Sequence, residues 1–191
     1  MILLLIDVDD ILIIGSNTFQ VSSFTTQLIN LEFALRDLEH LNYFLGLEVT
    51  YLPKDMHFNQ HRYIHNLLSR IGMVDTKLAH IPRALGKTLS ITNGDLFSDN
   101  HLYYSIVGAL QYVTFICPDI SFVVNKACLF MANPTSIHWL AVKRILRYLK
   151  GTSTHGFLSM RLLLLISMVI RMQTRLLVQM TDATPVDIIC F

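Results

Sequence analysis

Residues 1–15 read MILLLIDVDDILIIG, in which two apolar runs enclose a short acidic centre. The runs are residues 2–6 and 11–14, and the acidic residues are Asp7, Asp9 and Asp10. Apolar runs of this length and isoleucine content predict two buried strands joined by a tight turn. Such a turn would bring the acidic side chains to one exposed tip.

This acidic tip has two interpretations. Carboxylates that crowd together repel each other, and a divalent cation on oxygen ligands is a common counter-charge. Aspartate is also a favoured turn residue, so a hairpin turn without any chemistry is the alternative. Composition alone leaves both interpretations open.

The chain is apolar, and its charges are unevenly distributed. With 191 residues, 52% of them hydrophobic and 15% charged, it has room for one ordinary domain or two small ones with a sizeable core. Residues 1–52 have a charge balance of −6, whereas residues 53–191 have a balance of +7. An acidic tip before a basic body suits a metal site beside a polyanion-binding surface, and it also fits two parts that attract each other.

The cysteines and the termini indicate an intracellular protein. Cys117, Cys128 and Cys190 form no CxxC pair, which favours a reducing compartment. The N-terminal apolar run lacks a basic leader and is interrupted by aspartates, so it is no secretory signal. The apolar run at residues 162–170 is far shorter than the roughly 20 residues that cross a bilayer. We therefore expect a cytoplasmic or nuclear protein that is neither secreted nor membrane-bound.

The first half of the chain predicts a mixture of helix and strand. Apolar residues recur at helical spacing over residues 24–38, and residues 41–51 are strand-like. Residues 16–23 are polar and predicted to form a turn. A second turn is predicted at residues 53–55, before a short polar segment.

The second half predicts mainly helices. Residues 60–73 have apolar side chains on one helical face, with Gly72 near the stop. Residues 75–100 contain scattered proline, glycine and asparagine, which predicts a loop or linker. Three more helices are predicted at residues 102–115, 118–131 and 136–149, the last ending at Gly151.

Five segments, taken in order, resemble one family. They read LLLIDVDDILIIGSN, LRDLEHLNYFLGLEV, QHRYIHNLLSRIGM, YYSIVGALQYVTFICPDISFVVNKACLFMANPT and HWLAVKRILRYLKGT. The chain resembles the reverse transcriptase region of copia-type LTR retrotransposon Pol polyproteins over about residues 3–157. The first segment is similar to the palm hairpin whose family form is YVDD, and the second to the stretch ending in the primer-grip hairpin. The third resembles a thumb helix, and the last two resemble the connection before the RNase H domain.

The resemblance implies an α+β fold. A partial polymerase palm, made of the catalytic and primer-grip hairpins with a helix, would be followed by a helical thumb and connection. The implied domains are residues 1–52 for the C-terminal part of the palm, 53–100 for thumb and linker, 101–158 for the helical connection, and 159–191 for a remnant of the RNase H start.

The family activity is RNA-directed DNA polymerisation on a primed RNA or DNA template with dNTPs. This reaction is an in-line displacement at a nucleotide phosphate, helped by two Mg²⁺ ions held by carboxylates. By resemblance, Asp9 and Asp10 are the catalytic, metal-binding residues, with Asp9 the stronger ligand. Phe44, Leu45 and Gly46 match the primer grip, which acts through backbone and packing.

Some positions depart from the family pattern. Asp7 stands where the family has tyrosine, and Glu39 stands where it has glycine. The family's other metal-binding aspartate belongs to an earlier palm strand among the nucleotide-binding fingers. We therefore expect these 191 residues to be inactive alone. The alternative function is a remnant that binds nucleic acid or protein without catalysis, including self-association through an exposed palm edge.

Two smaller groups of residues are candidate binding sites. Lys143, Arg147 and Lys150 share a helical face with Arg144 adjacent, and they could contact nucleic-acid phosphates. A solvated face opposite the apolar one is the favoured alternative. His57, His61 and His65 are spaced by four, but without a third ligand they are best interpreted as surface histidines.

The last residues no longer match the family. Residues 168–191 read MVIRMQTRLLVQMTDATPVDIICF. Translated from the third base of each codon, with suitable synonymous codons, this segment gives a sequence close to the opening of the family's RNase H. Some outcomes are independent of codon choice, since Met172 before Gln173 must give alanine. The sequence therefore predicts a frameshift near residue 160, which an unshifted genomic sequence would disprove.

Overall fold

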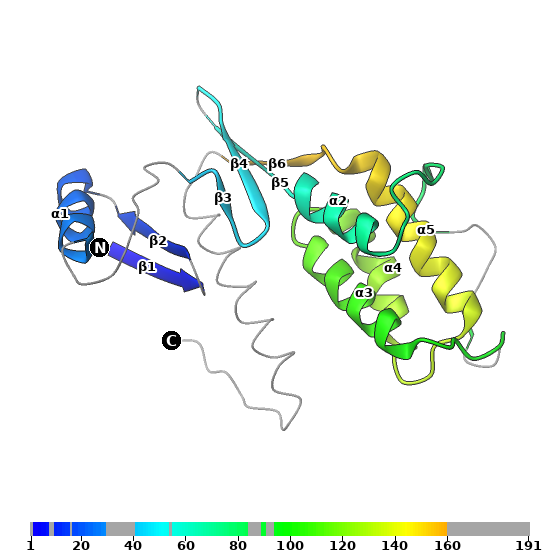
Figure 1. Cartoon of the computed structure of the whole chain (residues 1–191). Coiled ribbons are helices and arrows are strands. Elements are labelled where there is room, and N and C mark those ends of the chain that lie inside the picture. Colours follow the sequence, from blue (N-terminus) through cyan, green and yellow to red (C-terminus); the bar gives the residue numbers. More distant parts are fainter. Residues whose placement is uncertain are drawn as a thin grey trace.

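The computed structural model describes residues 2–7, 10–15, 17–29, 41–53, 55–83, 89–90 and 94–159. A hairpin with one helix lies at one end, a small antiparallel sheet lies in the middle, and a group of helices lies at the other end (Figure 1). This arrangement confirms a mixed α+β fold. Within the described residues, no helix is both long enough and apolar enough to cross a membrane.

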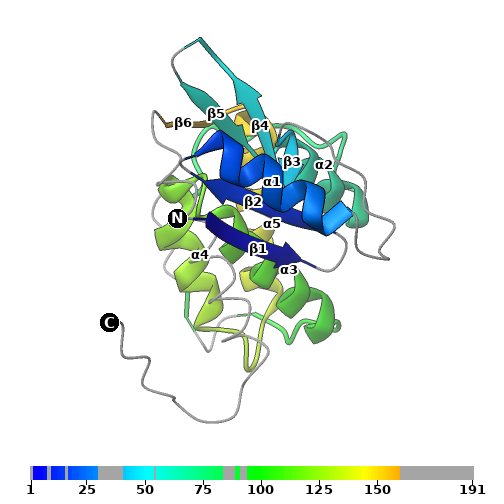
Figure 2. The same cartoon turned by 90° about the vertical axis from the view of Figure 1, so that its left-hand side faces the viewer.

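The N-terminal hairpin is confirmed. Strands β1 (Ile2–Asp7) and β2 (Asp10–Gly15) pair antiparallel, with Ile2 opposite Gly15 and Asp7 opposite Asp10. Helix α1 (Thr18–Ile29) follows and lies along the hairpin (Figure 2). Ile14 of β2 is buried and belongs to the main hydrophobic core, so the hairpin is joined to the rest of the fold.

The start of α1 corrects one prediction, because residues 16–23 were expected to form a turn. The Asn17 side-chain oxygen accepts a hydrogen bond from the backbone N of Phe19 at 3.0 Å and so caps the helix. The hydroxyls of Ser22, Thr25 and Thr26 donate to carbonyls three or four residues earlier, which satisfies these polar side chains inside the helix. The end of the predicted helix, residues 30–38, lies outside the described residues.

A four-stranded antiparallel sheet follows, in the order β3-β4-β5-β6. The strand-like residues 41–51 form β3 (Tyr43–Phe44) and β4 (Leu47–Tyr51) with a turn between them. Two strands were missed by the sequence analysis, β5 (Met56–Asn59) and β6 (Gly156–Ser159). They lie about a hundred residues apart in the chain, so their pairing leaves no local pattern.

The predicted helices are confirmed with small shifts in their bounds. They are α2 (His61–Arg70), α3 (Asn100–Val113), α4 (Ser121–Cys128) and α5 (Ser136–Thr152), and a 3₁₀ turn η1 (Pro118–Ile120) precedes α4. Helix α5 continues one residue past Gly151, where it was expected to end. That difference is within the usual spread of helix bounds.

The helices and the sheet share one hydrophobic core. Its fully buried side chains come from every one of these helices and from the sheet, for example Leu47, Ile64, Leu110, Val124 and Leu146. Burying such side chains provides the main favourable term in folding. Helices α2, α3, α4 and α5 therefore form a single packed unit with the sheet.

A buried histidine ties the start of α5 to a distant loop. The His138 ring is 1% exposed and stacks on Phe130 at a centroid distance of 3.9 Å. Its Nδ1 accepts from the backbone N of Thr135 at 3.0 Å, and its Nε2 donates to the carbonyl of Ser90 at 3.1 Å. Burial of the ring lowers the pKa of His138, although the bond to Ser90 partly opposes this.

This contact predicts a pH dependence of stability. Because the folded state lowers the pKa of His138 below its ordinary 6.5, its contribution is complete above pH 6.5 and is lost as the pH falls from there through the folded pKa. The free energy of unfolding, measured with urea, should therefore fall between about pH 7.5 and about pH 5.5.

The variant His138→Gln has no imidazole that titrates and can still form a capping box, so its free energy of unfolding should fall less over this pH range. The matched control His101→Gln, at an exposed position on α3, should behave like the original chain. An equal pH dependence in His138→Gln and His101→Gln would contradict this.

Candidate functional site

The acidic residues lie at the end of the β1–β2 hairpin. Asp7 and Asp10 are the last paired residues of the two strands, so Val8 and Asp9 form the connection. Val8 and Asp9, and the side chains of Asp7 and Asp10, lie outside what the structure describes. The assignment of Asp9 and Asp10 as metal ligands therefore stays a prediction.

Three aspartates lie within residues 7–10 of the sequence. Carboxylate oxygens are the ligands that Mg²⁺ prefers. Among the described residues, no three His, Cys, Asp or Glu side chains come together as a metal site.

The β3–β4 turn contains the residues that resemble a primer grip. Phe44 is 3% exposed and points into the core, while Leu45 and Gly46 make a two-residue turn between paired Phe44 and Leu47. Their φ angles are +49° and +74°, as a type I′ hairpin turn requires. Glycine adopts this conformation easily, whereas Leu45 adopts it at a cost.

Two tyrosines from different helices hold this turn. The hydroxyl of Tyr112 on α3 donates a hydrogen bond to the carbonyl of Leu45. A Cβ at Gly46 would lie 3.2 Å from the Tyr63 ring of α2 and 3.4 Å from the Tyr112 ring. The two rings contact each other with centroids 5.0 Å apart, and burial raises the pKa of Tyr63. The turn is therefore fixed to the helical unit.

The sequence analysis did not name Tyr112 as a candidate site residue. A tyrosine on an apolar helix face does predict a hydrogen bond, because its hydroxyl usually finds a partner when buried. The sequence does not predict the acceptor, since Leu45 lies 67 residues earlier in the chain.

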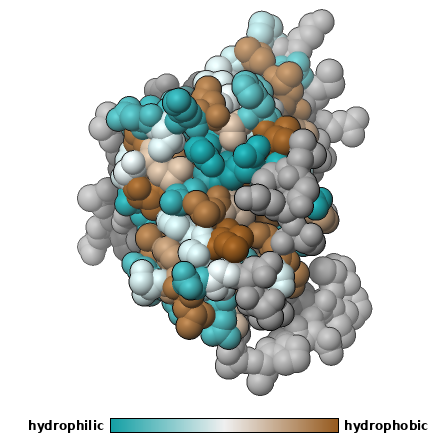
Figure 3. All heavy atoms as spheres, turned by 90° about the vertical axis from the view of Figure 1, so that its right-hand side faces the viewer, coloured by the Kyte–Doolittle hydropathy of each residue, from teal (hydrophilic) through white to brown (hydrophobic). Residues whose placement is uncertain are grey.

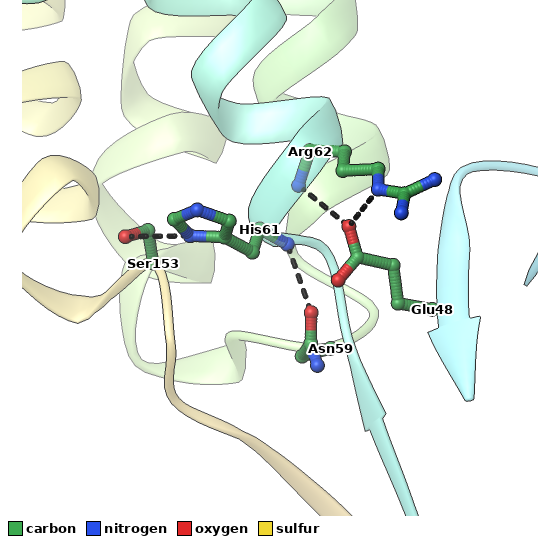
Figure 4. A network of polar contacts seen from close by, with 5 residues as sticks. All are labelled: Glu48, Asn59, His61, Arg62 and Ser153. Atoms are coloured by element: carbon green, nitrogen blue, oxygen red, sulfur yellow. Dashed lines mark hydrogen bonds and ion pairs between the residues drawn. The ribbon is translucent and has the colours of Figure 1, made fainter. Parts of the chain in front are cut away.

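A network of polar contacts joins the sheet to the start of α2 (Figure 4). A carboxylate oxygen of Glu48 on β4 accepts from the backbone N of Arg62 at 3.0 Å and lies 3.4 Å from its Nε. Asn59 on β5 accepts from the backbone N of His61 at 3.0 Å, and the His61 Nδ1 lies 3.3 Å from the Ser153 hydroxyl. Glu48 and Asn59 thus satisfy two of the N–H groups in the first turn of α2. His61 also has a structural contact with the segment that follows α5.

The basic residues of α5 contact a loop. The Nζ of Lys150 donates to the carbonyl of Thr76 at 2.8 Å, and the Nε of Arg144 donates to the carbonyl of Ile81 at 3.3 Å. The carbonyl of Arg147 accepts from the backbone N of Ala79 at 3.3 Å. The segment 76–81 therefore runs along this face of α5.

This contact gives the basic residues a structural role that neither interpretation of the sequence contained. Lys143, Arg144, Arg147 and Lys150 are all half-buried. Within the described residues, Lys143 makes no hydrogen bond or ion pair, so its charge is the most available of the four. The side of the molecule on which α5 lies presents hydrophobic and hydrophilic residues interspersed, without a continuous apolar surface (Figure 3).

Comparison with known proteins identifies the class of this chain. Residues 1–84 match the family described as reverse transcriptase (RNA-dependent DNA polymerase). This match includes the acidic hairpin, the β3–β4 turn and α2, so the chain carries part of a reverse transcriptase domain. No solved structure matches the chain significantly.

The relatives are more specific. The Retrovirus-related Pol polyprotein from transposon RE2 of Arabidopsis thaliana is 41% identical over 155 residues, covering 81% of this chain and 11% of the polyprotein. The corresponding polyprotein from transposon RE1 is 43% identical over 153 residues, covering 80% and 10%. An uncharacterized mitochondrial protein of the same plant is 39% identical over 153 residues, covering 80% of this chain and 63% of that protein.

These comparisons confirm the resemblance stated from the sequence. The chain is a fragment of the reverse transcriptase domain of copia-type retrotransposon Pol polyproteins. It matches only about a tenth of the length of the two transposon polyproteins.

The β3–β4 turn provides a test of the site's rigidity. The variant Gly46→Ala places a methyl group against two tyrosine rings at a positive φ, so we expect a loss of about 1–3 kcal/mol in the free energy of unfolding. Urea denaturation measures this loss. The matched control is Gly108→Ala on α3, where an added Cβ has no neighbour within 4 Å. That change should be neutral or stabilising by up to about 1 kcal/mol, because alanine favours helix. Equal stability of the two variants would show that the turn is not held as described.

Proposed function

We propose that this chain forms the C-terminal palm, thumb and connection of a reverse transcriptase. In this assignment residues 1–52 belong to the palm, 53–100 to the thumb and linker, and 101–158 to the connection, while 159–191 derive from a frameshifted RNase H start. The observation that carries the proposal is the β1–β2 register, which pairs Asp7 with Asp10 inside the segment that matches the family. The reaction of the whole protein would be RNA-directed DNA polymerisation with dNTPs on a primed template.

The acidic hairpin would hold Mg²⁺ through Asp9 and Asp10, with Asp7 adding negative charge beside them. When bound, the ions supply charge stabilisation and activate the primer hydroxyl. The chain's own contribution is to fix the carboxylates on a strand pair whose β2 side chain Ile14 is anchored in the core.

The β3–β4 turn would support the primer terminus through backbone groups. A turn of this kind needs rigidity more than reactive side chains, because positioning of the reacting groups provides much of the catalytic effect. Tyr112 bonded to the Leu45 carbonyl and Tyr63 packed on Gly46 supply that rigidity. Phe44 anchors the same turn from the core side.

We further propose that the 191 residues are inactive as a polymerase when tested alone but retain weak nucleic-acid binding. By resemblance, the family's metal site needs a further aspartate from another strand, and loss of metal positioning removes much of this type of catalysis. The basic residues of α5 would contact backbone phosphates, with Lys143 the most available.

A second candidate role is association through the β1–β2 hairpin. Leu4, Ile6 and Ile11 are 37%, 61% and 39% exposed on this two-stranded sheet. Exposed apolar strands with an open edge pair readily with another chain. Association with a second copy, or with a complete polymerase in the cytoplasm or nucleus, would explain this surface.

The combined test uses one RNA–DNA primer–template duplex. We expect the 191-residue chain to give no primer extension with Mg²⁺ and dNTPs but to shift the fluorescence anisotropy of the duplex at low salt. The variant Lys143→Gln should lower the magnitude of the slope of log affinity against log salt by about 1, because one phosphate contact is lost.

The control for that experiment is Lys143→Arg, which keeps the positive charge and should keep the slope. Primer extension by the chain alone would contradict the proposed inactivity. Absence of duplex binding at low salt, or an unchanged slope in Lys143→Gln, would contradict the binding role of α5. Analytical ultracentrifugation that shows only monomers would exclude self-association through the hairpin.

A further inference from the structure

We propose that Phe122, Arg83 and Lys126 form a binding site for single-stranded nucleic acid. A base would stack on the Phe122 ring, and the two cations would contact the phosphates beside it. This site goes beyond the proposed function, which requires only contacts to a duplex at α5 and at the β3–β4 turn.

The geometry brings the three side chains together from two elements. Phe122 lies in the first turn of α4 and is 62% exposed. The Arg83 Cζ and the Lys126 Nζ each lie 5.8 Å from the centroid of its ring. Cations at this distance are attracted by the face of an aromatic ring. The arrangement therefore keeps two positive charges beside an aromatic surface that water can reach.

A hydrogen bond to α5 holds the chain close to Arg83. Arg83 lies two residues after Ile81, whose carbonyl accepts a hydrogen bond from the Nε of Arg144 at 3.3 Å. Lys126 is on the same helix as Phe122, four residues later, so its place is fixed by helical spacing. The site is thus carried by packed elements of the fold.

The opposite side of α4 explains why Phe122 is not a core residue. Val124 and Ala127 are 0% and 1% exposed and provide the buried face of the helix. Phe122 and Leu129 are 62% and 75% exposed on the other face. Phe122 is therefore outside the core, and its ring is accessible beside the two cations.

The charge of the surroundings favours a polyanion. Asp119 lies in η1, three residues before Phe122, and its carboxylate accepts a hydrogen bond from the hydroxyl of Tyr148. That bond raises the pKa of Tyr148 to about 12. Asp119 is therefore engaged with α5, whereas Arg83 and Lys126 are the two cations that lie over the ring.

Single-stranded nucleic acid matches this combination better than a protein segment. Binding of single strands combines aromatic side chains that stack on bases with positive charges that follow the backbone. A duplex keeps its bases stacked inside and offers no free base face to Phe122. An acidic peptide would use the cations but would gain little from the ring.

The experiment measures the anisotropy of a fluorescein-labelled oligothymidylate of about 12 nucleotides at several salt concentrations. The variant Phe122→Leu removes the stacking surface and keeps an apolar side chain, so binding should weaken about tenfold at every salt concentration with an unchanged salt slope. Arg83→Gln and Lys126→Gln should each lower the magnitude of the slope by about 0.7, the value for one phosphate of a single strand. Ultraviolet cross-linking followed by mass spectrometry should locate the thymidine on the peptide that contains Phe122.

The matched control is Phe19→Leu on α1. Phe19 is 80% exposed and forms no cation–π pair with a described residue, so its replacement should leave binding unchanged. Equal effects of Phe122→Leu and Phe19→Leu, or a cross-link away from α4, would overturn the proposal. Effective competition by oligoglutamate would also overturn it, since that result indicates charge without stacking. Binding of the duplex without binding of oligothymidylate would contradict only this inference. Binding of oligothymidylate without binding of the duplex would contradict only the duplex binding proposed above.

Discussion

The hydrogen bond from Tyr112 to the Leu45 carbonyl fixes a turn of the small sheet to the helices. It connects a turn of the small sheet to the third helix, and the Tyr63 ring against Gly46 adds the second helix to the same point. Removing the donor would leave a partly buried carbonyl unsatisfied, which costs more than the bond itself contributes. Because both φ angles of the turn are positive, the turn depends on this support to keep its shape.

Several features surround this contact and make the sheet and the helices one unit. Glu48 and Asn59 cap the start of α2, and the long helix α5 reaches the same place through Ser153. At the far end, His138 links α5 to Ser90. The basic side chains of α5 are partly used to hold the segment 76–81, so positive charge in this family fragment serves packing as well as any contact with phosphate.

The sequence predicted the elements that are long or strongly periodic. The β1–β2 hairpin, α2, α3 and α5 follow from their apolar spacing, and the family followed from five motifs in order. It predicted a helix from residue 24 but missed the first half of α1, because Asn17 as a cap and serine and threonine hydroxyls bonded within the helix look like a turn in sequence. It also missed β6, whose pairing with β5 is decided by tertiary structure. At the candidate site it named Phe44, Leu45 and Gly46 but not Tyr112, since a contact across 67 residues has no local signature.

The central claim is that the hairpin end at residues 7–10 binds a divalent cation. Titration of the isotope-labelled chain with Mn²⁺, followed by the paramagnetic broadening of amide resonances, tests it most directly. The account predicts that broadening begins at residues 7–10 and that Mg²⁺ reverses it, with the effect lost when both Asp9 and Asp10 are replaced by asparagine. Broadening that begins instead at His61 and His65, or that persists in the double variant, would contradict the account.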